Sequence, residues 1–337
     1  MITGATTAIG RALVEELLDD AGTERVIAVG AEPTRGVESD GRVVRLRVDL
    51  RRERSIRELV FGPVREHGIT TVIDMATHRA ASALGSYALN VEETRRLMHF
   101  VERVDSVERF VYRSFGDVYR ARSDLPAIID EDHPLRIGPG VPQYVLDRVE
   151  ADLAVCARMG MSRIGIVVLR MAECLAPEAG SQLWDYLQSR VCMRPLGFDP
   201  MINLMSAEDA GAALALAAKS RAQGIFNIPG FDTLPLSRIL ERFGRTEVAV
   251  PSPLMRPAYA LRRATLGADF HWSLAEDRLR YGFVLDGQRA SEVLGYAPRH
   301  PVHWPLSLER VGRRAERRNP RALRGAIESI LRSRGGV

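Results

Sequence analysis

Short apolar runs rich in β-branched residues alternate with amphipathic stretches along the first 170 residues of the chain. The apolar runs lie at 25–30, 43–50, 70–76, 109–115 and 162–170, and the amphipathic stretches lie at 10–20, 55–68 and 90–104. Such runs suit strands that are buried on both faces, and the amphipathic stretches suit the helices that connect them. The pattern predicts an α/β fold with a doubly wound parallel sheet and helices on both faces.

The pattern becomes less regular after residue 175. Residues 180–191 have a helical pattern, and residues 206–220 have a stronger one that Ser206 opens as the N-cap. Residues 224–230 indicate one more strand. We therefore expect a sheet domain over 1–175, a smaller substrate-binding subdomain over 176–300 that is interleaved with it, and a basic tail over 301–337.

The composition fits a protein with a sizeable buried core, because 46% of the 337 residues are hydrophobic. The sequence contains no run of about 18 apolar residues, and no basic segment precedes an apolar stretch at its start, so a cytoplasmic location is expected. Cys156, Cys174 and Cys192 form no C-x-x-C pair and have no histidine-rich neighbourhood. They predict buried free thiols, and no metal site is expected.

Positive charge is concentrated in the tail, where nine arginines and three glutamates give residues 301–337 a net charge of +6. The rest of the chain carries a net charge of −2, so a nucleic-acid partner is not expected. Within residues 319–336, positions 322, 323, 326, 327, 330 and 331 form a narrow apolar stripe flanked by arginines. We expect this segment to dock on the body or on a second subunit of a homodimer; the alternatives are an anionic membrane surface, nucleic acid or a disordered end.

The chain opens with a glycine-marked turn, TGATTAIG over residues 3–10, that leads into a helical pattern. Gly4 and Gly10 fit the outer glycines of a dinucleotide-binding turn, whereas Thr7 and Ala8 stand where the middle glycine is expected. In such a turn the pyrophosphate binds free amide N–H groups at the start of the helix. The turn predicts binding of NAD or NADP, and a purely structural tight turn is the alternative.

Two features near this turn differ from the usual pattern. Only three residues precede Gly4, where a strand of about five residues is usual, which suggests a start upstream of the first residue. After the second strand, Glu32 favours NAD and Arg35 favours NADP, and the alternative is that both are solvated loop charges.

These segments resemble the extended short-chain dehydrogenase/reductases, the family of NAD-dependent epimerases and dehydratases that act mainly on nucleotide sugars. The motifs are TGATTAIG (3–10), VDL (48–50), DMAT (74–77), NVEETRRL (90–97), RFVYRSFGDVY (109–119), LRMAECLAP (169–177), NLMSAEDAGAALALA (203–217) and ASEVLGYAP (290–298). The resemblance implies a Rossmann fold, with the NAD(P)-binding domain over 1–175. The cofactor contacts that it implies are Gly4, Thr7, Ala8, Ile9, Gly10, Asp49, Leu50, Met75, Ala76, Asn90, Tyr144 and Arg148, with Glu32 as the ribose-binding acid.

The catalytic positions that the resemblance implies are partly changed. Tyr144 stands at the general acid/base, Arg148 replaces the lysine four residues later, and Phe115 replaces the serine or threonine that binds the substrate oxygen. Arg148 keeps a positive charge near the phenol but cannot lose its proton. Ser114 would take the place of Phe115 if a bulge turned it inward, and Asp117 stands where dehydratases of this family have an acidic residue.

Two other side chains are candidates to compensate. Lys219, which is the single lysine of the sequence, would have to reach across from a distant helix. His78 lies in a loop that the resemblance places near the nicotinamide, and a solvated histidine is the alternative.

Two hypotheses about function follow from these residues. The first is an NAD(P)-dependent epimerase/dehydratase-like protein or reductase that acts on a hydroxyl or carbonyl group of a small molecule, such as a nucleotide sugar, with Tyr144 as acid/base. The second is a catalytically degenerate dinucleotide-binding protein with a regulatory or scaffolding role. The fold alone does not decide between them, and the first is favoured.

Overall fold

The computed structural model describes residues 1–30, 40–76, 87–266 and 270–304. Glu32, Arg35, His78 and the segment 319–336 lie outside these residues. Among the described helices, none is both long and apolar enough to cross a membrane. The described residues also hold no group of three or more His, Cys, Asp or Glu side chains arranged to bind a metal ion.

Described strands and the residue Ile2 build a parallel sheet. The strands are β1 (Val26–Gly30), β2 (Val43–Arg47), β3 (Thr71–Asp74), β4 (Arg109–Phe115), β6 (Gly165–Met171) and β10 (Gly224–Ile228). Their pairing gives the orders β2-β1 and β3-β4-β6-β10, and every pair is parallel. Ile2 joins the two groups, because it bridges Ala28 on one side and Ile73 on the other. The prediction of a doubly wound parallel sheet is confirmed.

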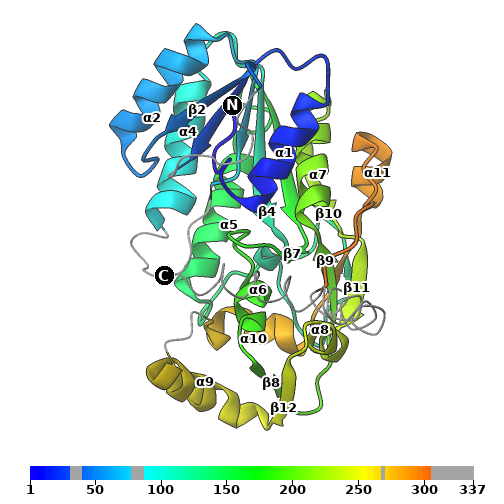
Figure 1. Ribbon diagram of the computed structural model, residues 1–337. Coiled ribbons are helices and arrows are strands. Elements are labelled where there is room, and N and C mark those ends of the chain that lie inside the picture. Colours follow the sequence, from blue (N-terminus) through cyan, green and yellow to red (C-terminus); the bar gives the residue numbers. More distant parts are fainter. Residues whose placement is uncertain (31–39, 77–86, 267–269, 305–337) are drawn as a thin grey trace, which may run out of the picture.

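Helices cover both faces of this sheet (Figure 1). One face carries α1 (Ala8–Leu18) and α7 (Ala207–Lys219), and the other carries α2 (Glu53–Leu59), α4 (Glu93–Val101) and α5 (Gln143–Cys156). The helices on each face enclose a hydrophobic core, and successive strand residues point into these two cores in turn. Val111 of β4 lies in one core, and its neighbours Phe110 and Tyr112 lie in the other. Side chains on both faces of the strands are therefore buried, which explains their continuous apolar runs.

Two of the predicted helices contain π-helical stretches. The helix predicted over 55–68 begins as α2 and continues as Val60–Val64, where Pro63 has no N–H to donate to an i−4 carbonyl. The helix predicted over 90–104 begins with the π-helical stretch Ala88–Glu92 and continues as α4.

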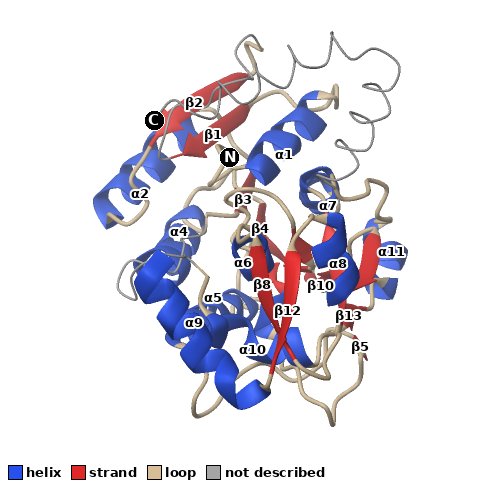
Figure 2. Cartoon of the chain, turned by 60° about the horizontal axis from the view of Figure 1, so that its bottom comes forward, coloured by secondary structure: helices blue, strands red, loops and turns tan. Residues whose placement is uncertain are grey.

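A smaller lobe lies beyond the carboxyl ends of the sheet strands (Figure 2). Its core includes Tyr186, Phe270 and Trp272. The elements of this lobe and of the segments that join it to the sheet are η3 (Gly116–Val118), β5 (Ile128–Ile129), β7 (Glu173–Cys174), α6 (Gln182–Leu187), β8 (Val191–Pro195), β9 (Met201–Met205), β11 (Asp232–Pro235), α8 (Leu236–Arg242), β12 (Thr246–Val250), α9 (Ser252–Leu266), α10 (Trp272–Arg280) and β13 (Val284–Leu285). The last helix, α11 (Gln288–Leu294), packs against β10 of the sheet.

The elements after residue 175 match the sequence pattern in part. Ser206 is the N-cap of α7, and its hydroxyl accepts from the amide of Asp209 (3.1 Å), as predicted. The helix predicted over 180–191 ends earlier, because α6 stops at Leu187 and Val191 already begins β8. β8 pairs in parallel with β12, so a partner strand distant in sequence overrides the local helical pattern.

Candidate active site

The turn before α1 is closed by the hydroxyl of Thr7. Thr7 Oγ1 donates to the carbonyl of Gly4 (2.9 Å) and accepts from the amide of Gly10 (3.1 Å), so Thr7 caps the helix. Gly4 has a φ of 66°, which favours glycine. A Cβ on Gly10 would lie 2.5 Å from the carbonyl oxygen of Gly4. Both glycines are therefore required by the shape of the turn, and the structure brings Gly4, Thr7 and Gly10 together.

The first turn of α1 offers hydrogen-bond donors to an anion. Ala8 and Ile9 begin the helix, and the amide N–H groups of a first helical turn have no partner within the helix. No acidic side chain lies in this turn. The amide of Gly10 is used by Thr7, so the amides of Ala8 and Ile9 and the positive end of the helix dipole make the turn suitable for a pyrophosphate.

A buried hydroxyl, that of Thr3, links this turn to the loop after β3. Thr3 Oγ1 donates to Asp74 Oδ1 (2.7 Å) and accepts from the amides of Met75 (2.9 Å) and Ala76 (3.0 Å). The other carboxylate oxygen of Asp74 accepts from Thr94 Oγ1 (3.0 Å). Met75 and Ala76, both predicted cofactor contacts, are therefore held beside the turn.

Asp74 and Glu93 form a pair of fully buried carboxyl groups next to this loop. Burial raises the pKa of Asp74 to about 6, although hydrogen bonds from Thr3 and Thr94 oppose the rise. Burial also raises the pKa of Glu93 well above its usual value, and the negative charge of Asp74 adds to this effect. The two carboxyl groups are therefore not both ionised at neutral pH.

Three further predicted cofactor contacts lie in two different surroundings. Leu50 and Asn90 are buried. Asp49 is partly exposed and pairs with Arg51 (2.8 Å) and Arg52 (3.3 Å). The hydrogen bond from Arg51 lowers the pKa of Asp49, so this carboxylate stays ionised at neutral pH.

Tyr144 and Arg148 lie one turn apart on the same buried side of α5. One Arg148 nitrogen, Nη2, donates to the phenol oxygen of Tyr144 and to the carbonyl of Gly180 (2.7 Å). The other terminal nitrogen, Nη1, donates to the carboxylate of Asp117. The structure therefore brings three of the four predicted catalytic side chains into one hydrogen-bonded group.

The surroundings of Tyr144 keep its phenol protonated. Burial raises the pKa of Tyr144 above its usual value, whereas the Arg148 charge opposes the rise and the Asp117 charge adds to it. Burial disfavours the charge of Arg148, but Asp117 and Tyr144 outweigh this and raise its pKa. The group therefore contains a neutral phenol beside a permanent cation.

Ser114 is not part of this group, because β4 pairs with β6 in a regular register without the bulge that would turn Ser114 inward. Its hydroxyl donates to Asp152 Oδ2 (2.5 Å), and Asp152 also pairs with Arg170 (2.6 Å). Strand alternation explains the outcome, because neighbouring residues of β4 face opposite sides of the sheet. Lys219 is likewise elsewhere, since its ammonium pairs with Asp20 (2.9 Å).

Phe115 fills the position beside Arg148 instead. The guanidinium carbon of Arg148 lies 3.6 Å from the centre of the Phe115 ring, and that of Arg113 lies 4.5 Å from it. Contacts of this kind are favourable between a cation and the face of an aromatic ring. The ring provides no hydrogen bond for a substrate oxygen.

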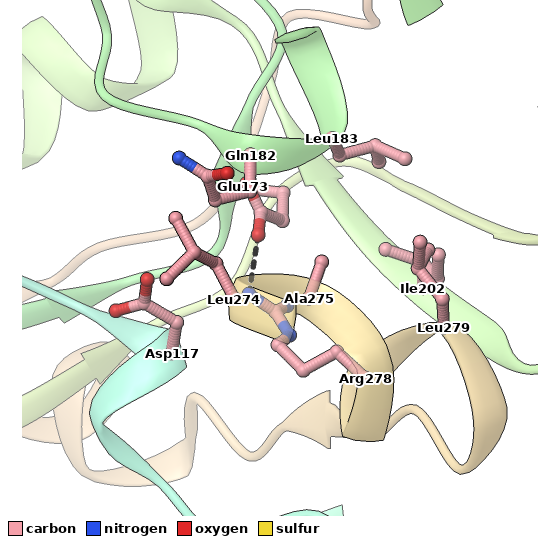
Figure 3. A pocket seen from close by; sticks show the side chains of 9 residues that line it. All are labelled: Asp117, Glu173, Gln182, Leu183, Ile202, Leu274, Ala275, Arg278 and Leu279. Carbon is pink, nitrogen blue, oxygen red and sulfur yellow. Dashed lines mark hydrogen bonds and ion pairs between the residues drawn. The ribbon is translucent and has the colours of Figure 1, made fainter. Parts of the chain in front are cut away.

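Two small adjoining cavities lie where these side chains meet the second lobe. One leaves ≈ 20 Å³ for the centres of water molecules and is lined by Asp117, Glu173, Gln182, Leu183, Ile202, Leu274, Ala275, Arg278 and Leu279 (Figure 3). Arg278 of α10 donates to Glu173 across it, and the hydroxyl of Ser181 donates to the same carboxylate. The other cavity leaves ≈ 10 Å³ and is lined by residues that include Arg113, Phe115, Arg148 and Cys174. Each space holds about one water molecule.

The sequence model of the NAD dependent epimerase/dehydratase family matches residues 1–194, which contain the turn, β4 and α5. The chain belongs to this family. The uncharacterized protein Rv0501 of Mycobacterium tuberculosis is 29% identical over 310 residues, which cover 89% of this chain and 80% of that protein.

Solved structures of family enzymes have a similar fold. DesIV, a dTDP-glucose 4,6-dehydratase from Streptomyces venezuelae with NAD and TYD bound, has a TM-score of 0.65 and 20% identity, over 94% of this chain and 96% of that chain. A UDP-glucuronic acid 4-epimerase from Bacillus cereus in complex with NAD has a TM-score of 0.66 and 15% identity, over 89% of this chain and 91% of that chain. At these identities the likeness concerns the fold.

Several polar residues of this epimerase/dehydratase-like site are not among the sequence candidates. Asp74 and Arg113 each interrupt an apolar strand run, and a charged residue inside such a run is a signal of a buried polar contact. Glu173 and Arg278 are 105 positions apart and have no comparable signal, because their pairing depends on how the two lobes meet.

We expect Gly10→Ala to destabilise the protein by about 1–3 kcal/mol, because the added methyl group would overlap the carbonyl of Gly4 and force the turn apart. Urea denaturation measures the change. Gly62→Ala is the matched control, since a Cβ there meets only the end of the Glu66 side chain at 4.0 Å, and its stability should be unchanged or slightly higher. Equal effects of the two substitutions would contradict the close approach at Gly10.

We expect Asp74→Asn to change how stability depends on pH. Between the usual aspartate value of 3.8 and the raised pKa of about 6, the folded state binds more protons than the unfolded state. The stability contributed by Asp74 is therefore complete below pH 3.8 and is lost as the pH rises through 6. Between pH 4 and pH 7, the free energy of unfolding of the variant should therefore rise relative to that of wild type by on the order of 2–3 kcal/mol.

Urea denaturation across this pH range checks the expectation, with Asp49→Asn as the control. The lowered pKa of Asp49 means that its contribution is present above the ordinary carboxylate value and is lost only in stronger acid. The difference in free energy of unfolding between Asp49→Asn and wild type should therefore be nearly constant across this pH range. A constant difference for Asp74→Asn would show that the Asp74 carboxyl does not titrate in this window.

Proposed function

We propose that the chain binds a nicotinamide dinucleotide, NAD in the first instance, and acts on a hydroxyl or carbonyl group of a small molecule of the nucleotide-sugar type. Tyr144 is the acid/base of this reaction. The observation that carries the proposal is the hydrogen bond from Arg148 to the Tyr144 phenol, next to a cavity at the carboxyl ends of β4 and β6. Ligands of open α/β sheets bind at this edge.

The turn before α1 supports the dinucleotide part of the proposal. Its two glycines allow a close approach of backbone segments, and the first amides of α1 are free to bind a pyrophosphate. Met75 and Ala76 are held beside it by Thr3. DesIV and the Bacillus cereus epimerase, which share the fold, were both crystallised with NAD. When bound, such a cofactor accepts or donates a hydride.

The protein's own contribution to the chemistry is a proton held at the Tyr144 phenol oxygen. Because the pKa of Tyr144 is raised by burial, the phenol is a proton donor to a substrate oxygen at neutral pH. Arg148 stabilises the phenolate that remains, because its fixed positive charge lies at hydrogen-bond distance. Arg148 orients and stabilises, but does not relay a proton.

A second candidate is a catalytically degenerate dinucleotide-binding protein. Phe115 is the specific observation in its favour, because the ring and two guanidinium groups fill the place of the hydroxyl that would bind a substrate oxygen. Both candidates require dinucleotide binding, and only the first requires the Tyr144 proton.

Dinucleotide binding is tested by the thermal stability of the full chain with NAD, NADH, NADP and NADPH. At a ligand concentration of 100 times the Kd, stabilisation of about 2.7 kcal/mol is expected. No shift with any of the four would contradict both candidates.

We expect Tyr144→Phe to slow turnover by about 10²- to 10⁴-fold and to leave the stabilisation by NAD unchanged, because only the phenol proton is removed. Turnover is measured by chromatography of the sugar products formed when nucleoside diphosphate sugars are added to the NAD-loaded chain, since a redox-neutral reaction gives no net change in the absorbance of the nicotinamide. Tyr296→Phe is the matched control, since that hydroxyl is bonded to Pro229 (2.8 Å) outside the site. Turnover that survives Tyr144→Phe would overturn the role of Tyr144, and NAD binding without any turnover would favour the degenerate protein.

A further inference from the structure

Arg113 of β4 is a buried cation whose charge has no carboxylate partner among the described residues. The residue is 4% exposed. Nη2 donates to the carbonyl of Ala179 (2.6 Å), whereas Nε has no hydrogen-bond partner. Burial lowers the pKa of Arg113 to about 10, which still leaves the guanidinium charged at neutral pH.

The other buried arginines of the described chain are paired. Arg136 pairs with Asp277 (3.0 Å) and Arg170 with Asp152 (2.6 Å). Arg148 pairs with Asp117. A buried charge is costly unless a counter-charge compensates it. Arg113 is thus the exception in the part of the chain that the structure describes.

Arg113, with its unpaired positive charge, lines the small cavity beside the Tyr144–Arg148 pair. The charged side chains that line it are Arg113, Arg148, Arg278, Asp117 and Glu173. The Asp117 carboxylate pairs with Arg148 through Oδ2 and the Glu173 carboxylate pairs with Arg278, whereas Asp117 Oδ1 has no hydrogen-bond partner. One positive charge, that of Arg113, therefore remains for a ligand. The nearby Asp185 of α6 raises the pKa of Tyr144 but does not line this cavity.

We propose that Arg113 binds an oxyanion of the substrate, a carboxylate or a phosphoryl group, in the cavity next to Tyr144. A planar guanidinium whose Nε–H has no partner matches an oxygen of such an anion. The proposal rests on the proposed function, because it assigns the anion to the molecule on which Tyr144 acts. It makes Arg113 a specificity-determining residue that selects an acidic substrate.

The size of the cavity limits how the anion enters. A volume of ≈ 10 Å³ for water centres is too small for a carboxylate or phosphate without a shift of its walls. The Arg278–Glu173 pair forms one wall, and Arg278 comes from α10 in the second lobe. A free anion should therefore bind less tightly than the same group carried on a substrate that also contacts the second lobe.

The test compares the melting temperatures of wild type and Arg113→Met in the full chain. Each is measured in sodium chloride alone and with part of the chloride replaced by inorganic phosphate or by acetate, at constant ionic strength. Phosphate or acetate should raise the melting temperature of wild type and should not raise that of Arg113→Met. Without either anion, Arg113→Met should melt at or above the wild-type temperature, because the unpaired buried charge is gone. A response to phosphate alone identifies a phosphoryl group, and a response to acetate identifies a carboxylate.

Arg54→Met is the matched control for non-specific anion effects, because Arg54 is an exposed cation that pairs with Glu58 (2.8 Å) on the surface. It should keep the full wild-type response to the anions. An equal response in Arg113→Met and wild type, or no response in wild type, would overturn the proposal. A lower melting temperature of Arg113→Met in chloride would also count against it, since that indicates a structural role.

Stabilisation of wild type by NAD, measured in the same buffers, separates this proposal from the proposed function. If NAD has no effect and the anion response still depends on Arg113, the dinucleotide function fails and the anion site stands. If NAD stabilises the chain and the anions have no effect that depends on Arg113, the anion site is overturned and dinucleotide binding stands.

Discussion

A single guanidinium group, that of Arg148, connects the parts of this site. It donates to Asp117 after β4, to Tyr144 on its own helix and to the carbonyl of Gly180 before α6, and it lies over the ring of Phe115. A lysine ammonium has three donors and no flat surface, so it could not make the same set of contacts. The arginine and the phenylalanine, which are separate departures from the family pattern, are therefore matched to each other in space.

Arg148 and Phe115 together set the protonation and the charge of the site. The ring and the planar cation exclude water from the Tyr144 phenol, which stays protonated, and the cation stabilises the phenol once ionised. With phenylalanine at position 115, however, the site lacks a hydroxyl there that would bind a substrate oxygen. Arg113, whose guanidinium also lies over the Phe115 ring, adds a positive charge to the site.

Much of the architecture could be predicted from sequence because it depends on local rules. The apolar runs predict the parallel strands, Thr7 and Ser206 cap α1 and α7, and the spacing of Tyr144 and Arg148 is one helical turn. The rest depends on contacts between distant segments. The strand β8 exists through its pairing with β12, and the Glu173–Arg278 pair depends on how the two lobes meet.

The hydroxyl of Thr3 also has a consequence for the order of folding. Its partner Asp74 lies 71 positions away, and Asp74 is in turn fixed by Thr94. Contacts between residues far apart in sequence form late, because the long intervening loop must first be closed. During synthesis the first turn leaves the ribosome before most of the sheet exists, so it cannot reach its native hydrogen bonding until β3 and α4 have emerged. The turn is therefore synthesised before β3 and α4, and its hydrogen bonds are completed only after them.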